Sequence, residues 1–189
     1  MKITRLFLVL SVAAFLLKAA FATTVIPPTF DGLVTQAEVI FQGSVTATKS
    51  QYVGDGPDRH IATFVTFKVN DIYKGSPGNT YTMELMGGTV GNDTMEVTDA
   101  PRFKVGDRDI LFVEHNGSQF IPLVGIMHGR FRIQQDQATG REIVATNSGA
   151  PIADVTQLGR DERAASVGNP LTLLDFKAVV QTRLGVLPQ

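Results

Sequence analysis

The residue types that most often carry catalysis or bind metals are sparse in this sequence. It contains three histidines and no cysteine among 189 residues. His60, His115 and His128 lie too far apart to form an i, i+4 pair on a helix, and a zinc site needs three or four converging ligands. Asp55 and Asp58 beside His60 offer fewer oxygen ligands than calcium requires. We therefore predict no metal site and interpret the histidines as surface or turn residues.

Motifs for nucleophilic catalysis are also missing. The absence of cysteine excludes thiol chemistry, and the sequence has neither a G-x-S-x-G nor an S-x-x-K motif. These observations favour a chain without catalytic residues or a cofactor. The alternative that stays open is a site assembled from distant residues, either a Ser–His–Asp triad or paired carboxylates.

A glycine-rich segment, MGGTVGND over residues 86–93, is the most distinctive polar motif. It is not a P-loop, because no lysine follows the glycines, and no G-x-G-x-x-G lies within a βαβ unit. Glycines at such positions permit positive φ angles or close backbone approach. Met86 falls on the polar side of its expected strand, which makes it a candidate exposed apolar contact.

Loops on a rigid scaffold commonly carry recognition, so we place the candidate binding site at this segment. The loop over residues 53–60 or the segment 125–129 is expected beside it. The predicted binding residues are Met86, Gly87, Gly88, Asn92, Asp93, His60 and His128.

Charge gives little reason to expect a nucleic acid or an anionic membrane as partner. Lysines and arginines number 17 against 18 acidic residues, whereas nucleic-acid-binding domains are typically basic. Arg130 and Arg132 fall on the polar side of an expected strand, and we interpret them as part of a solvated face.

The first 22 residues have the three-part pattern of a secretory signal. Lys2 and Arg5 precede the apolar run LFLVLSVAAFLL over residues 6–17, and Ala20 and Ala22 supply the small residues before a cut. That run is shorter than the roughly 20 residues that span a bilayer. We therefore expect a signal peptide over 1–22 and one exported domain over 23–189, either periplasmic or extracellular and free of the membrane once the signal is removed. An uncleaved N-terminal anchor is the alternative.

The remaining pattern is mainly β. Alternating apolar residues predict strands from residue 39 and from 61 to 73, with a bulge at Asn70-Asp71. Further strands are expected around residues 81–85, 94–97, 110–113, 120–124, 129–134 and 143–144. Asn116-Gly117 favours a hairpin between two of them. A short helix is expected over 29–37, and an amphipathic helix over 172–184 has an apolar stripe formed by Leu173, Phe176, Val180 and Leu184.

Many short strands separated by turn signals indicate a closed or partly open antiparallel β-barrel with one helix at each end. Residues 69–75 (VNDIYKG) and 103–108 (FKVGDR), which lead into the apolar strand 110–113, resemble the netrin-like domain. That family includes the tissue inhibitors of metalloproteases and implies a barrel of the oligonucleotide/oligosaccharide-binding (OB) type. The inhibitors act through an N-terminal cysteine that this chain lacks, so the resemblance implies fold and no functional residue.

The function expected from these observations is a non-enzymatic secreted or periplasmic binding module of unknown ligand, whose partner is a secreted or envelope protein. An envelope-associated enzyme and an inhibitor or partner of an extracellular protease are the alternatives. The sequence leaves the oligomeric state open.

Overall fold

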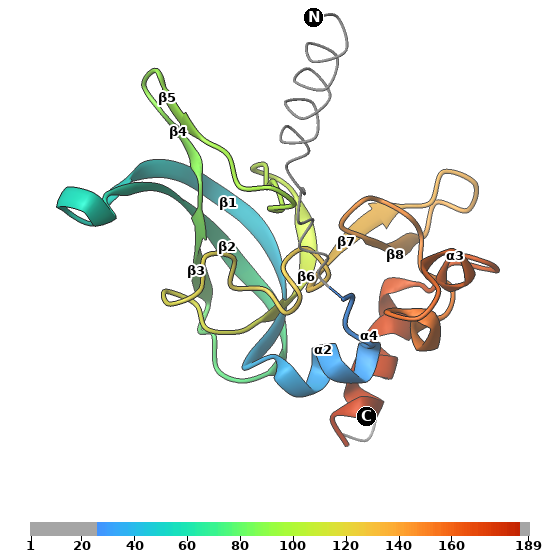
Figure 1. The fold of residues 1–189 in the computed structure, drawn as a ribbon. Coiled ribbons are helices and arrows are strands. Elements are labelled where there is room, and N and C mark those ends of the chain that lie inside the picture. Colours follow the sequence, from blue (N-terminus) through green and yellow to red (C-terminus); the bar gives the residue numbers. More distant parts are fainter. Residues whose placement is uncertain (1–25, 186–189) are drawn as a thin grey trace, which may run out of the picture.

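A computed structural model describes residues 26–185, and the predicted signal peptide lies outside this range (Figure 1). The main sheet has six strands in the order β3-β2-β1-β6-β7-β8, and every neighbouring pair is antiparallel. A separate hairpin is formed by β4 (Gly88–Val90) and β5 (Asp93–Met95). The strands of the main sheet are β1 (Val39–Val53), β2 (His60–Lys74), β3 (Thr80–Met86), β6 (Arg108–Val113), β7 (Arg130–Gln135) and β8 (Glu142–Thr146).

The centre of the sheet is buried on both faces. Ile110, Leu111, Phe112 and Val113 are all at most 1% exposed, as four consecutive apolar residues predict. Ile110 and Phe112 join a core beneath the helices, whereas Leu111 and Val113 join a second core inside the curl of β1, β2 and β3. The sheet therefore separates two apolar clusters instead of enclosing one.

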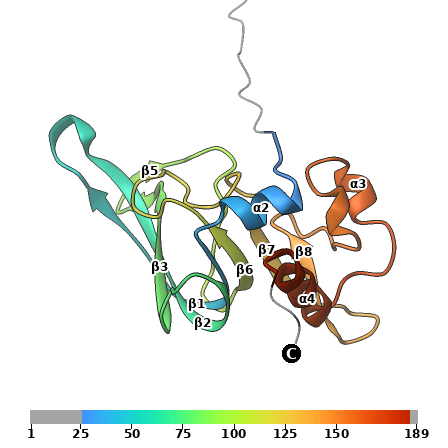
Figure 2. The same ribbon diagram turned by 90° about the horizontal axis from the view of Figure 1, so that it is seen from below.

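Three helices lie on the side of the first core (Figure 2): α2 (Phe30–Gln36), α3 (Glu162–Ala165) and α4 (Leu173–Arg183). Thr29 caps α2, because its hydroxyl accepts from the backbone N–H of Gly32 at 3.2 Å. Thr172 caps α4 in the same way, because its hydroxyl accepts from the backbone N–H of Asp175. Single 3₁₀ turns occupy Gly56–Asp58 and Val155–Gln157.

The docking face of α4 is narrower than the predicted stripe. Phe176 and Val180 are fully buried, whereas Leu173 and Leu184 are half-buried at the two ends. Phe176 packs its ring against Phe30 of α2 and Phe131 of β7. Aromatic contacts thus join both terminal helices to the sheet.

Of the two forms expected, a closed or a partly open barrel, the closed form is wrong: the mainly β, antiparallel sheet is open between β3 and β8, with no strand ladder closing it among the described residues. The expected Asn116-Gly117 hairpin and the strand over 120–124 are also not formed. An irregular segment over residues 114–124 lies there instead, bonded to β3 through Met86 N–H to the Phe120 carbonyl and to β6 through one bridge, Val113 to Leu123. Pro122, which has no N–H, and the positive φ of His115 prevent this segment from continuing a regular ladder.

The long β1–β2 hairpin is bent by bulges. One lies opposite Gln42 and Gly43, where Asn70 is skipped in the pairing, as the sequence predicts. Another lies between Val45 and Ala47. Because of the second bulge, Ala47 is exposed, although strict alternation along the strand would place it on the same face as the buried Val45. Bulges increase local twist, and here the outer part of the hairpin extends away from the sheet.

Candidate functional site

A cavity lies on the concave face of β2 and β3. We call it the β2–β3 cavity; its volume is about 310 Å³. It lies beside the second core and is bounded by the β4–β5 hairpin and by the segment 96–103, whose Val97, Ala100 and Phe103 pack on that core. Its lining comprises Thr63, Val65, Leu85, Met86, Gly87, Gly88, Thr89, Thr94, Met95, Glu96, Val97, Ala100, Pro101, Arg102 and Phe103.

Gly87 and Gly88 turn the chain from the end of β3 across this concave face. Their φ angles are 100° and 137°, which only glycine adopts easily. A Cβ on Gly87 would lie 2.9 Å from the carbonyl oxygen of Met95. A Cβ on Gly88 would collide with the hydroxyls of Ser50 and Thr63. Gly88 is therefore required for the close approach of this segment to β1 and β2, and Gly87 for its close approach to Met95 of β5.

Polar contacts hold the β4–β5 hairpin over the β1–β2 hairpin. The Tyr52 hydroxyl donates to the Asp93 carboxylate, and this hydrogen bond raises the pKa of Tyr52. The Arg59 guanidinium lies 4.0 Å from the centre of the Tyr52 ring, a cation–π contact. Beneath them, the Thr63 hydroxyl donates to the Gly87 carbonyl at 2.6 Å and bonds the Ser50 hydroxyl.

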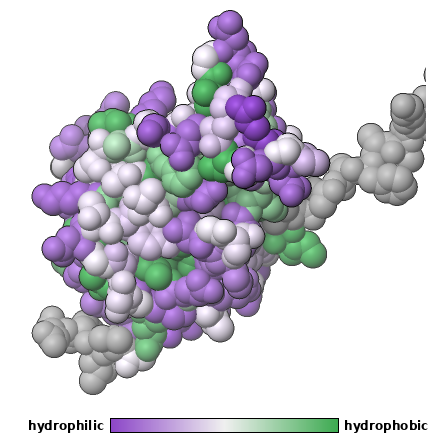
Figure 3. Space-filling model, turned by 90° about the vertical axis from the view of Figure 1, so that its left-hand side faces the viewer, coloured by the Kyte–Doolittle hydropathy of each residue, from purple (hydrophilic) through white to green (hydrophobic). Residues whose placement is uncertain are grey.

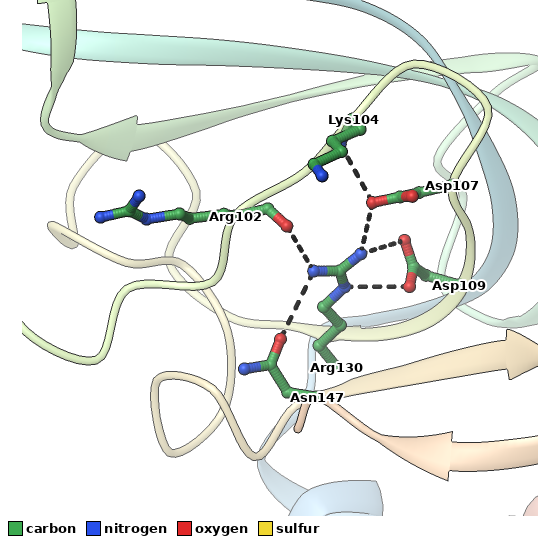
Figure 4. Close-up of polar contacts among 6 residues, drawn as sticks. All are labelled: Arg102, Lys104, Asp107, Asp109, Arg130 and Asn147. Atoms are coloured by element: carbon green, nitrogen blue, oxygen red, sulfur yellow. Dashed lines mark hydrogen bonds and ion pairs between the residues drawn. The ribbon is translucent and has the colours of Figure 1, made fainter. Parts of the chain in front are cut away.

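The far wall of the cavity is anchored by a buried arginine (Figure 4). Arg130 is 3% exposed, and its guanidinium donates to Asp109 at 2.9 and 3.1 Å and to Asp107 at 2.9 Å. Its remaining N–H groups donate to the Arg102 carbonyl at 2.7 Å and to the Asn147 side chain at 3.4 Å. The guanidinium carbon also lies 4.0 Å from the centre of the Phe103 ring.

This cluster is structural rather than a ligand site. The five donors of the guanidinium all have acceptors, so none is left for an incoming anion. Burial raises the pKa of Asp109, and Arg130 opposes that increase. Because Arg102 and Phe103 belong to the cavity wall, Arg130 fixes that wall to β6 and β7.

The interpretation of Arg130 as part of a solvated face is therefore wrong. Arg130 lies on the side of β7 that carries polar residues, as predicted. That side is not solvated at Arg130, because the Asp109 side chain of β6 lies next to it. Only the pairing of β6 with β7 brings the two residues together. The sequence offers no local signal for such a pair, since the partners are 21 positions apart.

Another cavity, of about 240 Å³, lies between the sheet and the helices. His128 lines it; burial lowers the pKa of this histidine, and Glu162 opposes the decrease. Apolar side chains of Leu33, Phe131 and Leu158 form much of the wall.

The predicted binding residues are divided by the fold. Met86, Gly87 and Gly88 line the β2–β3 cavity, Asn92 and Asp93 lie in the adjoining hairpin, and His128 lines the other cavity. His60 is the first residue of β2 and lines neither of these two cavities. Its Nδ1 lies 2.8 Å from the Asp58 carbonyl oxygen. Sequence reasoning missed the segment 96–103, because its contribution depends on where Arg130 holds it.

Catalytic geometry is not apparent in residues 26–185. His128, Ser148 and Glu162 line one cavity, but no hydrogen bond joins a hydroxyl to a histidine ring anywhere in this range. The same range contains no cluster of three histidine, aspartate or glutamate side chains suited to a metal ion. No helix in it is both long and apolar enough to cross a bilayer.

Comparison with protein-family models, with curated proteins and with solved structures gave no significant match for this chain.

Proposed function

We propose that this chain is an exported, non-enzymatic binding module, periplasmic or extracellular, that recognises a secreted or envelope protein. The partner inserts an apolar side chain into the β2–β3 cavity and contacts the β4–β5 hairpin beside it. Met86, Gly87, Gly88, Asn92 and Asp93 contribute to this surface.

The observation that carries the proposal is the character of the cavity. Ligand pockets have volumes from about 300 Å³ upward, and the volume of this cavity lies at the lower end of that range. Val65, Leu85 and Phe103 supply apolar walls, while Thr89, Thr94 and the exposed Glu96–Arg102 ion pair supply polar groups near them. An apolar pocket with a few polar groups suits binding, whereas a catalytic site would require a nucleophile joined to a base.

The outer surface supports a local contact rather than a broad hydrophobic interface. Figure 3 views the molecule from the side of the β1–β2 tip, with the β4–β5 hairpin projecting at the top. Apolar surface on this face occurs in separate patches between polar side chains. A partner that reached into one cavity would find more buried apolar area there than on the flat surface around it.

At the level of fold, we propose that the domain is an open relative of the netrin-like and OB-type barrels. The order β6-β1-β2-β3 is a Greek key, in which the fourth strand returns beside the first, and the OB fold is a Greek-key barrel. OB folds bind ligands on the face of their second and third strands. We propose that the β2–β3 cavity, which Thr63 and Val65 of β2 and Leu85 of β3 line, corresponds to that binding face.

Capture of partners from the exported fraction tests the proposal. The protein and its Met86→Ala/Asn92→Ala variant would each be immobilised, and retained proteins would be identified by mass spectrometry. We expect the variant to fold normally and to lose the partner. Equal capture by the folded variant would remove these residues from the binding surface.

A further inference from the structure

The outer half of β1 has a free edge within residues 26–185. β1 pairs with β6 only from Val39 to Ser44, and Val45 makes the last backbone bonds on that side, to Gly106 and Asp107. Beyond it, residues 46–53 have backbone partners only on β2. A strand edge with unpaired N–H and C=O groups is a template for another strand.

The two outermost strands, in contrast, are covered. The side chain of Asn116 accepts from the Glu84 N–H and donates to the Thr82 carbonyl, which occupies the open side of β3. On the open side of β8, the Val144 N–H donates to the Leu171 carbonyl and the Val144 carbonyl accepts from the Ile152 N–H. The Thr146 N–H donates to the Ala150 carbonyl. The fold thus covers the edges of β3 and β8 with its own residues, whereas residues 46–53 of β1 have backbone partners only on β2.

The bonding pattern identifies which groups point outward. Backbone groups alternate between the two sides of a strand. The Ile61 carbonyl accepts from Gly87 on the β3 side, so Ala62 and Phe64 face β1. Their partners Gln51 and Lys49 therefore bond to β2.

The N–H and C=O groups that face away from β2 are then those of Thr48, Ser50 and Tyr52. These groups form a regular row of donors and acceptors along the outer part of the hairpin. Thr46, Ala47, Thr48 and Lys49 are exposed at the beginning of this edge.

We propose that this edge pairs antiparallel with the same edge of a second copy of the chain, about a twofold axis at Ser50. Ser50 then bonds Ser50 of the second copy, and Thr48 bonds Tyr52, so that every outward group of the row is used. On either side of the twofold axis, Lys49 of one copy lies opposite Gln51 of the other, so no two side chains of like charge lie opposite each other. A register centred on Lys49 would instead place two ammonium groups opposite each other, which is unfavourable.

The shape of the molecule leaves space for this arrangement. In Figure 2 the β1–β2 hairpin extends beyond the rest of the sheet. Isologous pairing of one patch with itself is the commonest form of a homodimer. The opposing interpretation is that Lys49 and the bulge at Val45–Ala47 protect the edge, as such features do in monomeric proteins.

Sedimentation equilibrium of the purified protein across a wide concentration range tests this dimer. We expect a mass of two chains at high concentration and dissociation in Thr48→Pro, which removes an outward N–H but no bond to β2. Thr48→Ala retains the N–H and serves as the matched control, and it should still dimerise. Melting curves for both variants would show that the fold is intact.

Gln51→Glu tests the register of the proposed dimer without removing a backbone N–H, as Thr48→Pro does. It would place a carboxylate opposite Lys49 at two symmetric positions and should tighten the dimer about two- to tenfold at low salt. Gln51→Lys should weaken it. A single-chain mass for the unmodified protein at every concentration, or dimerisation equally strong in folded Thr48→Pro, would overturn the proposal.

Discussion

Arg130 shows how one residue can position a cavity that it does not line. Its guanidinium connects Asp109 of β6, the Arg102 carbonyl and Asn147. Removing one partner of a buried ion pair leaves the other charge without compensation. We therefore expect the stability of the fold and the shape of the cavity wall both to depend on the Arg130 side chain.

Arg130→Met should lower the free energy of unfolding by about 3–5 kcal/mol in urea at neutral pH. Arg132→Met is the control on the same strand, because the Arg132 side chain makes no hydrogen bond or ion pair within the described residues, and it should cost less than about 1 kcal/mol. A similar small loss in both variants would contradict a structural role for the Arg130 cluster.

The stability of the Arg130→Met variant should depend on pH in a direction that the pKa of Asp109 determines. Burial already raises the pKa of Asp109 in the folded protein, and loss of the guanidinium should raise it further. Between the ordinary pKa and this higher one, the folded state binds more protons than the unfolded state, so acidification stabilises the fold. Part of the lost stability should consequently return between pH 7 and pH 5, relative to the unmodified protein at the same pH values.

The glycine segment can be tested at the scale of an element. Gly88→Ala should lower stability by about 2 kcal/mol or more, because its Cβ would meet Ser50 and Thr63 in a backbone conformation reserved for glycine. Gly91→Ala in the same hairpin is the control. It also has a positive φ but no atom within 4 Å of an added Cβ, so its thermal unfolding should change much less. An equal loss of stability in the two variants would show that the positive φ alone, and not the close approach to Ser50 and Thr63, accounts for the effect of Gly88→Ala.

The C-terminal helix should be integral to the domain. Ending the chain at Asn169 removes the buried Phe176 and Val180 and uncovers the β8 edge that Leu171 bonds. A helix of this length is marginal by itself in water, so packing must hold it. We expect a melting temperature lower by several degrees or binding of a dye specific for apolar surface; an unchanged melting curve without dye binding would mean that the helix contributes no packing.

Elements that local pattern determines could be predicted from the sequence, and elements set by distant pairing could not. The long strands, the bulge at Asn70 and the helix after Thr172 follow from alternation, capping and spacing. The open sheet does not, because an Asn-Gly pair favours a hairpin locally, whereas Asn116 bonds β3 through its side chain instead. Likewise, Gly87 and Gly88 could be predicted to turn the chain, but the cavity beneath them depends on where Arg130 places residues 96–103.

For the whole molecule, export remains a prediction from the sequence. Mass spectrometry of protein recovered from the exported fraction should show Thr23 as the first residue, because Ala20 and Ala22 supply the small residues that signal peptidases require. A membrane-bound form that retains Met1 would contradict cleavage after Ala22.

Filling the β2–β3 cavity with a larger side chain tests the proposal that this cavity binds a partner. Ala100 lines it, so Ala100→Leu adds bulk inside without altering charge, and Ala138→Leu makes the same change on an exposed turn. Both variants and the unmodified protein would be compared by partner capture from the exported fraction, after their melting temperatures are shown to match. We expect only Ala100→Leu to lose the captured protein; undiminished capture by folded Ala100→Leu would contradict binding in this cavity.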